Sequence, residues 1–131
     1  MSGINQLDEM LRALLPTLQQ GEYVFCTVTG ELTQYLHLNP IASFIEAEGL
    51  TLVLHKEIAS DANLHYDGVF KQITLSVHSS LNAVGLTAAV SSKLASKQIS
   101  ANVIAAYYHD HIFVPIDNAE LALATLTELM D

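Results

Sequence analysis

The order of apolar and polar residues predicts a strand, a helix and a hairpin in the second half of the chain. Apolar and polar residues alternate over 73–78, which is the period of a strand with one buried face. Apolar residues then recur every four positions over 82–97, which predicts a helix. The runs 102–108 and 112–116 are apolar and rich in β-branched residues, and the polar turn His109-Asp110-His111 between them indicates a hairpin. Together these elements predict a compact α+β unit.

The first part of the chain predicts a helix followed by a strand. Leucines at helical spacing predict a helix over 5–18, with Asn5 as its N-cap and Pro16 as the residue that ends or kinks it. The segment 23–29 alternates like a strand and turns Cys26 toward the core. We expect an inert buried thiol at this position, because no basic neighbour in the sequence would lower its pKa.

The segments that follow predict a loop, a second hairpin and a short helical piece. We expect 29–40 to be a partly packed loop, since glycine and proline interrupt it and its apolar residues follow no clear period. Apolar runs at 42–47 and 50–55 flank Glu48-Gly49, the short glycine-containing connection that is typical of a hairpin. The segment 56–63 predicts one or two helical turns.

The end of the chain predicts a helix over 117–130, rich in alanine and leucine. Asp117 and Glu120 have the spacing of a capping box at its start. A strand, a connection, a hairpin and a helical piece therefore occur in 23–63 and again in 73–129. This order indicates an approximate internal repeat.

The predicted fold is α+β, with an antiparallel-dominated sheet on which the helices 5–18, 82–97 and 117–130 pack. The repeat predicts an N-terminal half at 1–70, with a helix, a strand and a hairpin, and a C-terminal half at 71–131. We expect the two halves to form one compact unit, because 131 residues of which 50% are hydrophobic suffice for one sizeable core.

Charge and composition exclude several classes of function. Five basic residues against 14 acidic ones give a net charge of −9, which has the wrong sign for binding nucleic acid or an anionic membrane. No apolar window approaches the roughly 20 residues that cross a bilayer, and no signal sequence opens the chain. With a single cysteine, an internal disulfide is impossible. We therefore expect a cytoplasmic protein without a membrane or nucleic-acid partner.

Few residues suggest catalysis or metal binding. The two histidines of His109-Asp110-His111 are two residues apart, so on a strand both side chains lie on the same face. Such a pair could belong to a metal site or to an acid–base site. Structural zinc takes four ligands, so two histidines alone do not form a zinc site. The alternative is a solvated hairpin tip. Glu46 and Glu48 are either paired carboxylates or a solvated face beside a turn. Since no P-loop, dinucleotide-binding, nucleophile-elbow or Cys-x-x-Cys motif occurs, we predict no cofactor, no metal and no catalytic residue.

The polar segment His78–Gly85 is the strongest candidate for binding. It joins a predicted strand to the start of a predicted helix, where free backbone N–H groups and the helix dipole favour an anion such as a carboxylate. The alternative interpretation is that Ser79, Ser80 and Asn82 only cap the helix.

The sequence resembles the ACT domain, a ferredoxin-like βαββαβ module that binds regulatory ligands. The resemblance rests on the order of elements, on Gly85 near the helix start, on the hairpin FIEAEGLTLVLH and on the run YYHDHIFVP. It extends over residues 21–130 and is similar to a family of small bacterial ACT-like proteins related to the cytosolic arginine sensors of eukaryotes. It implies two ACT-like halves. In ACT domains the strand-to-helix loop lines the amino-acid pocket, so the resemblance implies these ligand-binding residues: Ser79, Ser80, Leu81, Asn82, Ala83, Val84 and Gly85.

The sequence thus favours a non-catalytic regulatory module that binds a small molecule, an amino acid by resemblance. One alternative is a ligand-free module for oligomerisation or protein interaction, and another is a small metabolic enzyme. A homodimer or higher homo-oligomer is expected, because ACT-like units resemble modules that complete a layer against another copy.

Overall fold

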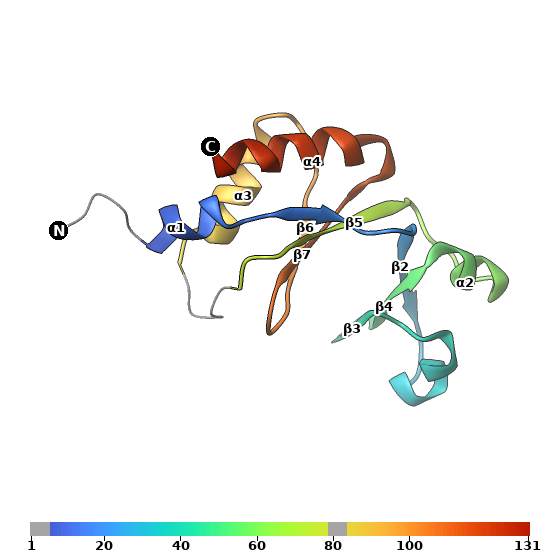
Figure 1. Cartoon of the computed structure of the whole chain (residues 1–131). Helices are drawn as coiled ribbons and strands as arrows, with labels where there is room; N and C mark the ends of the chain where they lie inside the picture. The colour runs from blue at the N-terminus through green and yellow to red at the C-terminus, as the bar shows by residue number, and fades with distance from the viewer. Residues whose placement is uncertain (1–5, 79–83) are drawn as a thin grey trace. The chain divides into compact units, whose positions relative to one another are not determined.

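The computed structural model describes residues 6–78 and 84–131 and has the predicted α+β class (Figure 1). The described residues form two compact units, which we call the terminal unit and the central unit. The terminal unit comprises the described residues of 1–20 and 71–131, and the central unit is Gly21–Phe70. The predicted halves divide the chain at residue 70 instead, which places residues 6–20 in the N-terminal half together with the central unit.

The sheet of the central unit is antiparallel. Its strands are β2 (Tyr23–Val28), β3 (Ala42–Glu46) and β4 (Gly49–His55), in the order β3-β4-β2. Strand β4 runs along all of β2, and on its other side it forms the predicted hairpin with β3. Phe70, the first residue of β5, adds one pair to this sheet, opposite Tyr23.

Two short helical elements complete the central unit. The 3-10 helix η1 (Leu32–Leu38) lies within the segment predicted as a loop, and α2 (Lys56–Asp61) is the predicted helical piece. A capping box opens η1, in which Glu31 and Gln34 each bind the backbone of the other. Alternate residues of β2 and β4 pack against both elements in a small core, whose buried members are Val24, Cys26, Val28, Leu38, Leu50, Leu52, Leu54 and Ala59.

In the terminal unit the strands lie in the order β1-β5-β7-β6. They are β1 (Pro16–Leu18), β5 (Phe70–Leu75), β7 (Asp110–Pro115) and β6 (Asn102–Ala105). Strand β1 pairs antiparallel with β5, and β6 pairs antiparallel with β7. The N-terminal strand thus completes a sheet whose other members come from the second half of the sequence.

Three α-helices belong to the terminal unit: α1 (Gln6–Arg12), α3 (Leu86–Ala95) and α4 (Ala119–Thr127). The 3-10 turns η2 (Ile116–Asn118) and η3 (Glu128–Met130) flank α4. Their apolar faces share one core with the sheet, whose fully or nearly fully buried members are Met10, Leu14, Ile73, Leu75, Leu86, Val90, Leu94, Ile99, Ile112, Val114, Ala119, Ala122 and Leu126. The predicted helical face with a four-residue repeat is therefore confirmed as the buried face of α3.

The predicted helix over 5–18 is wrong in its second half. Helix α1 ends at Arg12, and Pro16–Leu18 forms β1 opposite Ile73–Leu75. Pro16 cannot continue a helix, and Leu15 has a positive φ of 43°, so the chain turns there into an extended strand. The predicted cap Asn5 lies outside the described residues.

The predicted capping box of the last helix is also absent. Asn118 is the N-cap of α4 and makes no side-chain cap hydrogen bond, and the turn η2 occupies the position of the predicted first turn. The hydroxyls of Thr125 and Thr127 donate instead to backbone carbonyls of α4, each four residues earlier in the helix.

The hairpin tip was misplaced by the sequence prediction. Strand β7 starts at Asp110, and the tip is Ala106–His109, with the Ala106 N–H donating to the His109 carbonyl at 3.1 Å. Asp110 is only 8% exposed. The interpretation of His109-Asp110-His111 as a solvated tip is therefore wrong for Asp110 and for the part-buried His111.

Candidate functional site

The loop singled out by the sequence lies in the terminal unit, between β5 and α3. Five of its predicted ligand-binding residues, Ser79, Ser80, Leu81, Asn82 and Ala83, lie outside the described residues. The remaining two are described. Val84 is 86% exposed, and Gly85 is the N-cap of α3.

Gly85 has a backbone conformation that suits glycine. Its φ is +101°, and a Cβ atom at this position would lie 3.2 Å from Leu7 Cδ2 of α1. Both the left-handed backbone and the close approach of α1 favour a residue without a side chain. The start of α3 is therefore held tightly against α1.

The β6–β7 hairpin tip lies beside the end of β5. The His78 ring, the last described group before the loop, lies 5.7 Å from the Tyr108 ring between centroids, and the Tyr108 ring lies 5.0 Å from that of Tyr107. Both tyrosines are exposed. The structure therefore brings aromatic rings of the hairpin next to His78, and the sequence did not predict this contact because the hairpin was expected to end in the histidines.

The central unit contains a similar arrangement, and there the structure shows a pocket. Its connection from β2 to η1 and the tip of the β3–β4 hairpin line one pocket of about 520 Å³. The lining residues are Thr29, Gly30, Glu31, Leu32, Ile45, Glu46, Ala47, Glu48, Gly49 and Leu50. The corresponding contact of the terminal unit, among the described residues, is that of His78 with Tyr108 of the hairpin tip.

The lining of this central-unit pocket is acidic. It contains Glu31, Glu46 and Glu48 and no basic side chain. The backbone N–H of Glu31 donates to Gln34 Oε1 at 2.7 Å, and Glu46 accepts a hydrogen bond from the Thr51 hydroxyl. The predicted pair Glu46 and Glu48 does share a pocket, and both residues are exposed, as in the solvated-face interpretation.

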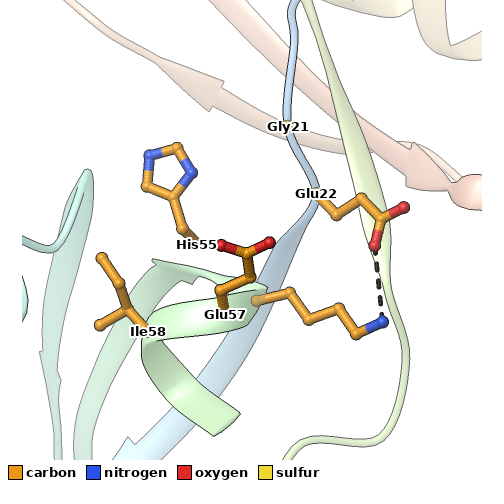
Figure 2. A pocket seen from close by; sticks show the side chains of 6 residues that line it. Gly21, Glu22, His55, Glu57 and Ile58 are labelled. Atoms are coloured by element: carbon orange, nitrogen blue, oxygen red, sulfur yellow. Dashed lines mark ion pairs between the residues drawn. The ribbon is translucent and has the colours of Figure 1, made fainter. Parts of the chain in front are cut away.

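A second pocket of the central unit, of about 490 Å³, lies where β4 leads into α2 (Figure 2). The Lys56 ammonium lies 3.6 Å from a Glu22 carboxylate oxygen, and both side chains are about 40% exposed. His55 packs its ring 4.7 Å from that of Tyr23. Exposed ion pairs of this kind contribute at most about 1 kcal/mol, so the charged groups of this pocket carry little stability.

Neither a metal site nor a reactive thiol is present among the residues that the structure describes. No three His, Cys, Asp or Glu side chains in the described ranges are placed to hold one metal ion. Burial raises the pKa of the Cys26 thiol, which disfavours the thiolate. The expectation of an inert buried cysteine agrees with this environment.

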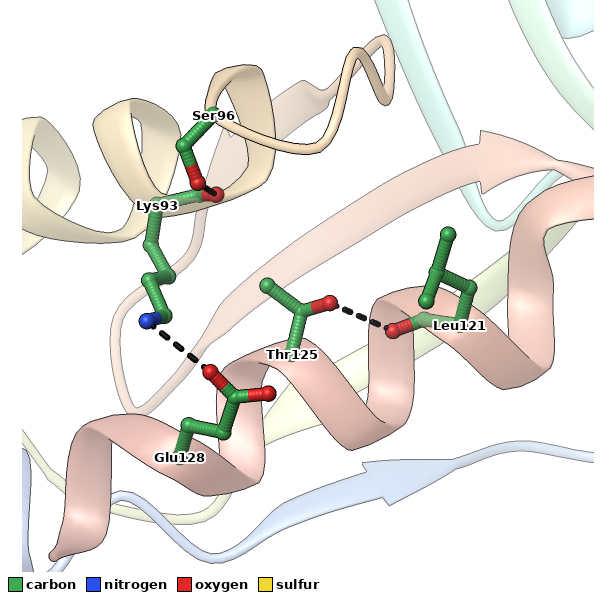
Figure 3. Close-up of polar contacts among 5 residues, drawn as sticks. All are labelled: Lys93, Ser96, Leu121, Thr125 and Glu128. Carbon is green, nitrogen blue, oxygen red and sulfur yellow. Dashed lines mark hydrogen bonds and ion pairs between the residues drawn. The ribbon is translucent and has the colours of Figure 1, made fainter.

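Helices α3 and α4 are joined by an ion pair at their C-terminal ends (Figure 3). The Lys93 ammonium lies 3.0 Å from a Glu128 carboxylate oxygen. The hydrogen bond from Lys93, with the attraction of its charge, holds the pKa of Glu128 below its usual range. Nearby, the Thr125 hydroxyl donates to the Leu121 carbonyl at 2.7 Å. The ion pair links the ends of the two helices, and the Thr125 bond lies within α4.

None of the described helices is both long and apolar enough to cross a membrane.

Several solved structures are similar to the chain. A Vibrio cholerae protein of unknown function, described as a possible transport protein, is 55% identical with a TM-score of 0.91, over 99% of this chain and 100% of that one. An Agrobacterium tumefaciens protein is 14% identical with a TM-score of 0.68, over 88% of this chain and 87% of that one. The regulatory subunit of aspartate kinase from Thermus flavus is 8% identical with a TM-score of 0.66, over 91% of this chain and 99% of that one. No curated protein matches the chain.

Family models identify both repeats. One ACT-domain model matches residues 2–71, and a second ACT-domain model matches residues 70–128. The Vibrio cholerae relative matches along the whole chain, and the more distant structures share the fold. The chain therefore belongs to the ACT-domain family and carries two ACT repeats.

Proposed function

We propose that this protein is a non-catalytic regulatory module that binds a free amino acid, with the loop Ser79–Gly85 as its principal site. The observation that carries the proposal is the recurrence of one arrangement in both units. In the central unit a strand-to-helix connection and a hairpin tip line a pocket of about 520 Å³, and in the terminal unit Tyr108 of the hairpin tip lies beside His78, the last described residue before the loop. Membership of the ACT family and the shared fold of an aspartate kinase regulatory subunit support a regulatory role by analogy.

The chemistry of the terminal-unit loop suits the carboxylate of an amino acid. Helix α3 is ten residues long, and no side chain of its N-cap residue Gly85 occupies the first backbone N–H groups. Free N–H groups and the positive end of the helix dipole favour a carboxylate there, and they act at short range although the whole chain carries a charge of −9. The exposed Val84 after the loop and the Tyr108 ring, which lies beside His78 before it, offer apolar surface for a side chain.

Thermal denaturation in the presence of each common amino acid at millimolar concentration tests the proposal. A ligand at 100 times its dissociation constant stabilises the fold by about 2.7 kcal/mol, which raises the melting temperature of a domain of this size by several degrees. No shift with any amino acid would refute amino-acid binding.

Three matched variants then locate the site, because each replaces an exposed aliphatic residue with a bulky one. Val84→Trp adds an indole beside the terminal-unit loop, Ile45→Trp adds one in the central-unit pocket, and Leu36→Trp is the control on η1. The proposal expects the shift to be lost in Val84→Trp and kept in Leu36→Trp. Loss in Ile45→Trp alone would place the ligand in the central unit and contradict the assigned loop.

A second candidate function, assembly without a ligand, is favoured by strand β3. This strand is at one edge of the central unit's sheet, and its Phe44 and Ile45 are 71% and 83% exposed. An exposed apolar edge strand is a template for pairing with another chain, including a second copy that would form a homodimer. Light scattering over a tenfold concentration range tests it: a constant monomer mass contradicts assembly, and Phe44→Lys should abolish a dimer that uses this edge.

A further inference from the structure

The pocket of the central unit where β4 leads into α2 contains charged side chains of both signs. We call it the β4–α2 pocket, and its lining residues are Gly21, Glu22, His55, Lys56, Glu57 and Ile58. Its volume of about 490 Å³ is that of a site for a small molecule. Lys56 is the only lysine or arginine in Gly21–Phe70. The one side chain of the central unit that is always positive therefore lines this pocket.

The backbone places the Lys56 and Glu22 side chains together without using up their hydrogen-bonding groups. The Lys56 N–H donates to the Glu22 carbonyl at 2.9 Å, which fixes the start of α2 beside the residue that precedes β2. Between the side chains, the ammonium nitrogen lies 3.6 Å from a carboxylate oxygen (Figure 2). This separation exceeds the roughly 2.7–3.2 Å of a hydrogen bond. The two groups attract each other, and this contact leaves the ammonium protons and the carboxylate lone pairs to bond a ligand.

Gly21 leaves the His55 ring uncovered on one side of the pocket. A Cβ atom at Gly21 would lie 3.5 Å from His55 Nδ1 and 3.5 Å from the Tyr23 hydroxyl. Its φ of +98° also suits glycine. The His55 side chain does not cap α2, and its ring packs 4.7 Å from that of Tyr23. The imidazole is thus held in the wall of the pocket, with Nδ1 beside a residue that has no side chain.

The mixture of charges restricts the chemistry of a ligand. A ligand with only a negative charge would meet the carboxylates of Glu22 and Glu57, and one with only a positive charge would meet the Lys56 ammonium. A small molecule that carries both charges can place each beside an opposite one. The other pocket of the central unit differs, because its charged lining residues, Glu31, Glu46 and Glu48, are all acidic and disfavour any carboxylate.

We propose that the β4–α2 pocket is a second binding site, which takes a small zwitterion such as a free α-amino acid. The carboxylate of the ligand accepts hydrogen bonds from Lys56 and His55. Its ammonium group donates to the carboxylates of Glu22 and Glu57. No residue of the loop Ser79–Gly85 takes part, so this site stands whether or not that loop binds a ligand.

We expect weaker binding here than at a fully enclosed site. The Lys56 and Glu22 side chains are about 40% exposed, so water and salt screen their attraction for a ligand. The site should therefore fill only at high millimolar concentration, and added salt should weaken binding.

Nuclear magnetic resonance of the full chain, labelled in the histidine and lysine side chains, tests this site. Titration with each common amino acid to tens of millimolar should shift the His55 ring and Lys56 side-chain signals saturably for at least one of them. Two analogues of that amino acid, one without the amino group and one without the carboxylate, should each bind about tenfold more weakly or worse. The absence of a saturable shift at both residues would overturn the site, and equal binding of either analogue would overturn the zwitterion.

Charge-removing variants separate a bound ligand from a general effect of charge. Lys56→Gln should weaken binding at the His55 signals about tenfold or more, whereas Lys97→Gln, which removes one positive charge from the exposed end of α3, should leave it unchanged. Lys56→Gln should fold, because an exposed ion pair contributes little stability. Glu57→Gln tests the ammonium end in the same way. Binding as tight as in the wild type in either variant contradicts the assigned contacts.

The same titration distinguishes failure of this site from failure of the proposed function. Val84→Trp should abolish ligand-induced shifts near the loop Ser79–Gly85 and leave those at His55 in place. Loss of the His55 response in Val84→Trp would show that the β4–α2 pocket has no ligand of its own, and would refute the second site.

Discussion

The substitution Gly85→Ala tests the geometry at the start of α3. Gly85 has a φ of +101°, and an added Cβ atom would lie 3.2 Å from Leu7 Cδ2. A side chain in such a backbone conformation costs roughly 1–3 kcal/mol. Alanine also restricts the unfolded chain, which offsets roughly 0.4–1 kcal/mol of that cost. The contact with Leu7 adds little, because the end of a leucine side chain can move by a few tenths of an ångström.

With the middle value of each range, the net loss expected is roughly 1.3 kcal/mol. An unfolding entropy of about 2.1 cal/mol/K per residue amounts to roughly 0.28 kcal/mol/K for 131 residues. The melting temperature should then fall by roughly 5 °C. This change is well above the precision of a melting experiment.

Circular dichroism during heating, with urea denaturation at 25 °C, measures the effect. Gly68→Ala is the matched control, since its added Cβ atom would make an ordinary contact with the Phe70 ring at 3.4 Å, without a positive φ. The control should melt at or slightly above the wild-type temperature. If Gly85→Ala were as stable as Gly68→Ala, the cost assigned to the left-handed backbone of Gly85 would be wrong.

Three further predictions concern the terminal unit. Leu94→Ala should lower the free energy of unfolding by about 2–5 kcal/mol in urea, because Leu94 is fully buried; the half-exposed Leu121→Ala on α4 should cost clearly less, and equal losses would contradict the assigned helix face. Asp110→Asn should stabilise the fold at pH 7. Burial raises the pKa of Asp110, so wild-type stability falls as the pH rises from the ordinary aspartate pKa to the raised value in the folded protein. A loss of stability at pH 7 in urea denaturation would contradict this. Glu128→Gln should reduce the loss of stability that acid causes. The Lys93 hydrogen bond lowers the pKa of Glu128, so the ion pair stabilises the fold at neutral pH and is lost as the pH falls through the lowered pKa. If the dependence of stability on pH between 3 and 7, measured in urea, were the same in wild type and variant, the ion pair would contribute nothing.

Local patterns in the sequence were sufficient for the elements whose residues pack on one another within a short segment. The β3–β4 hairpin, the helical piece after it and the buried face of α3 all follow from period and turn residues. The capping box of Glu31 and Gln34 was also readable, since the two residues have the spacing of the motif, but the glycine and proline around it favoured a loop.

The sequence singled out the strand-to-helix loop of the terminal unit as a candidate site, because polar residues interrupt two clear periods there. This loop stays a prediction, and Gly85 at its end has a positive φ. The pocket of the central unit was missed, because it forms where the β2–η1 connection meets a hairpin tip about 15 residues later in the sequence. No local pattern reports that two loops will lie together.

The sequence by itself determined the fold class and most helices and strands, because these depend on the spacing of apolar residues along the chain, and its resemblance to the ACT domain indicated the two ACT repeats. Tertiary structure alone decided that Pro16–Leu18 is a strand and that, in β7, Asp110 is buried and His111 is part-buried. A strand of three residues is too short to show an alternation of apolar and polar positions. The polar residues that follow Tyr107 and Tyr108 have the composition of a turn. Their conformation is fixed by partners that are distant in the sequence or on a neighbouring strand: β1 is a strand because it pairs with Ile73–Leu75, and His111 belongs to β7 because it pairs with Ile104 of β6.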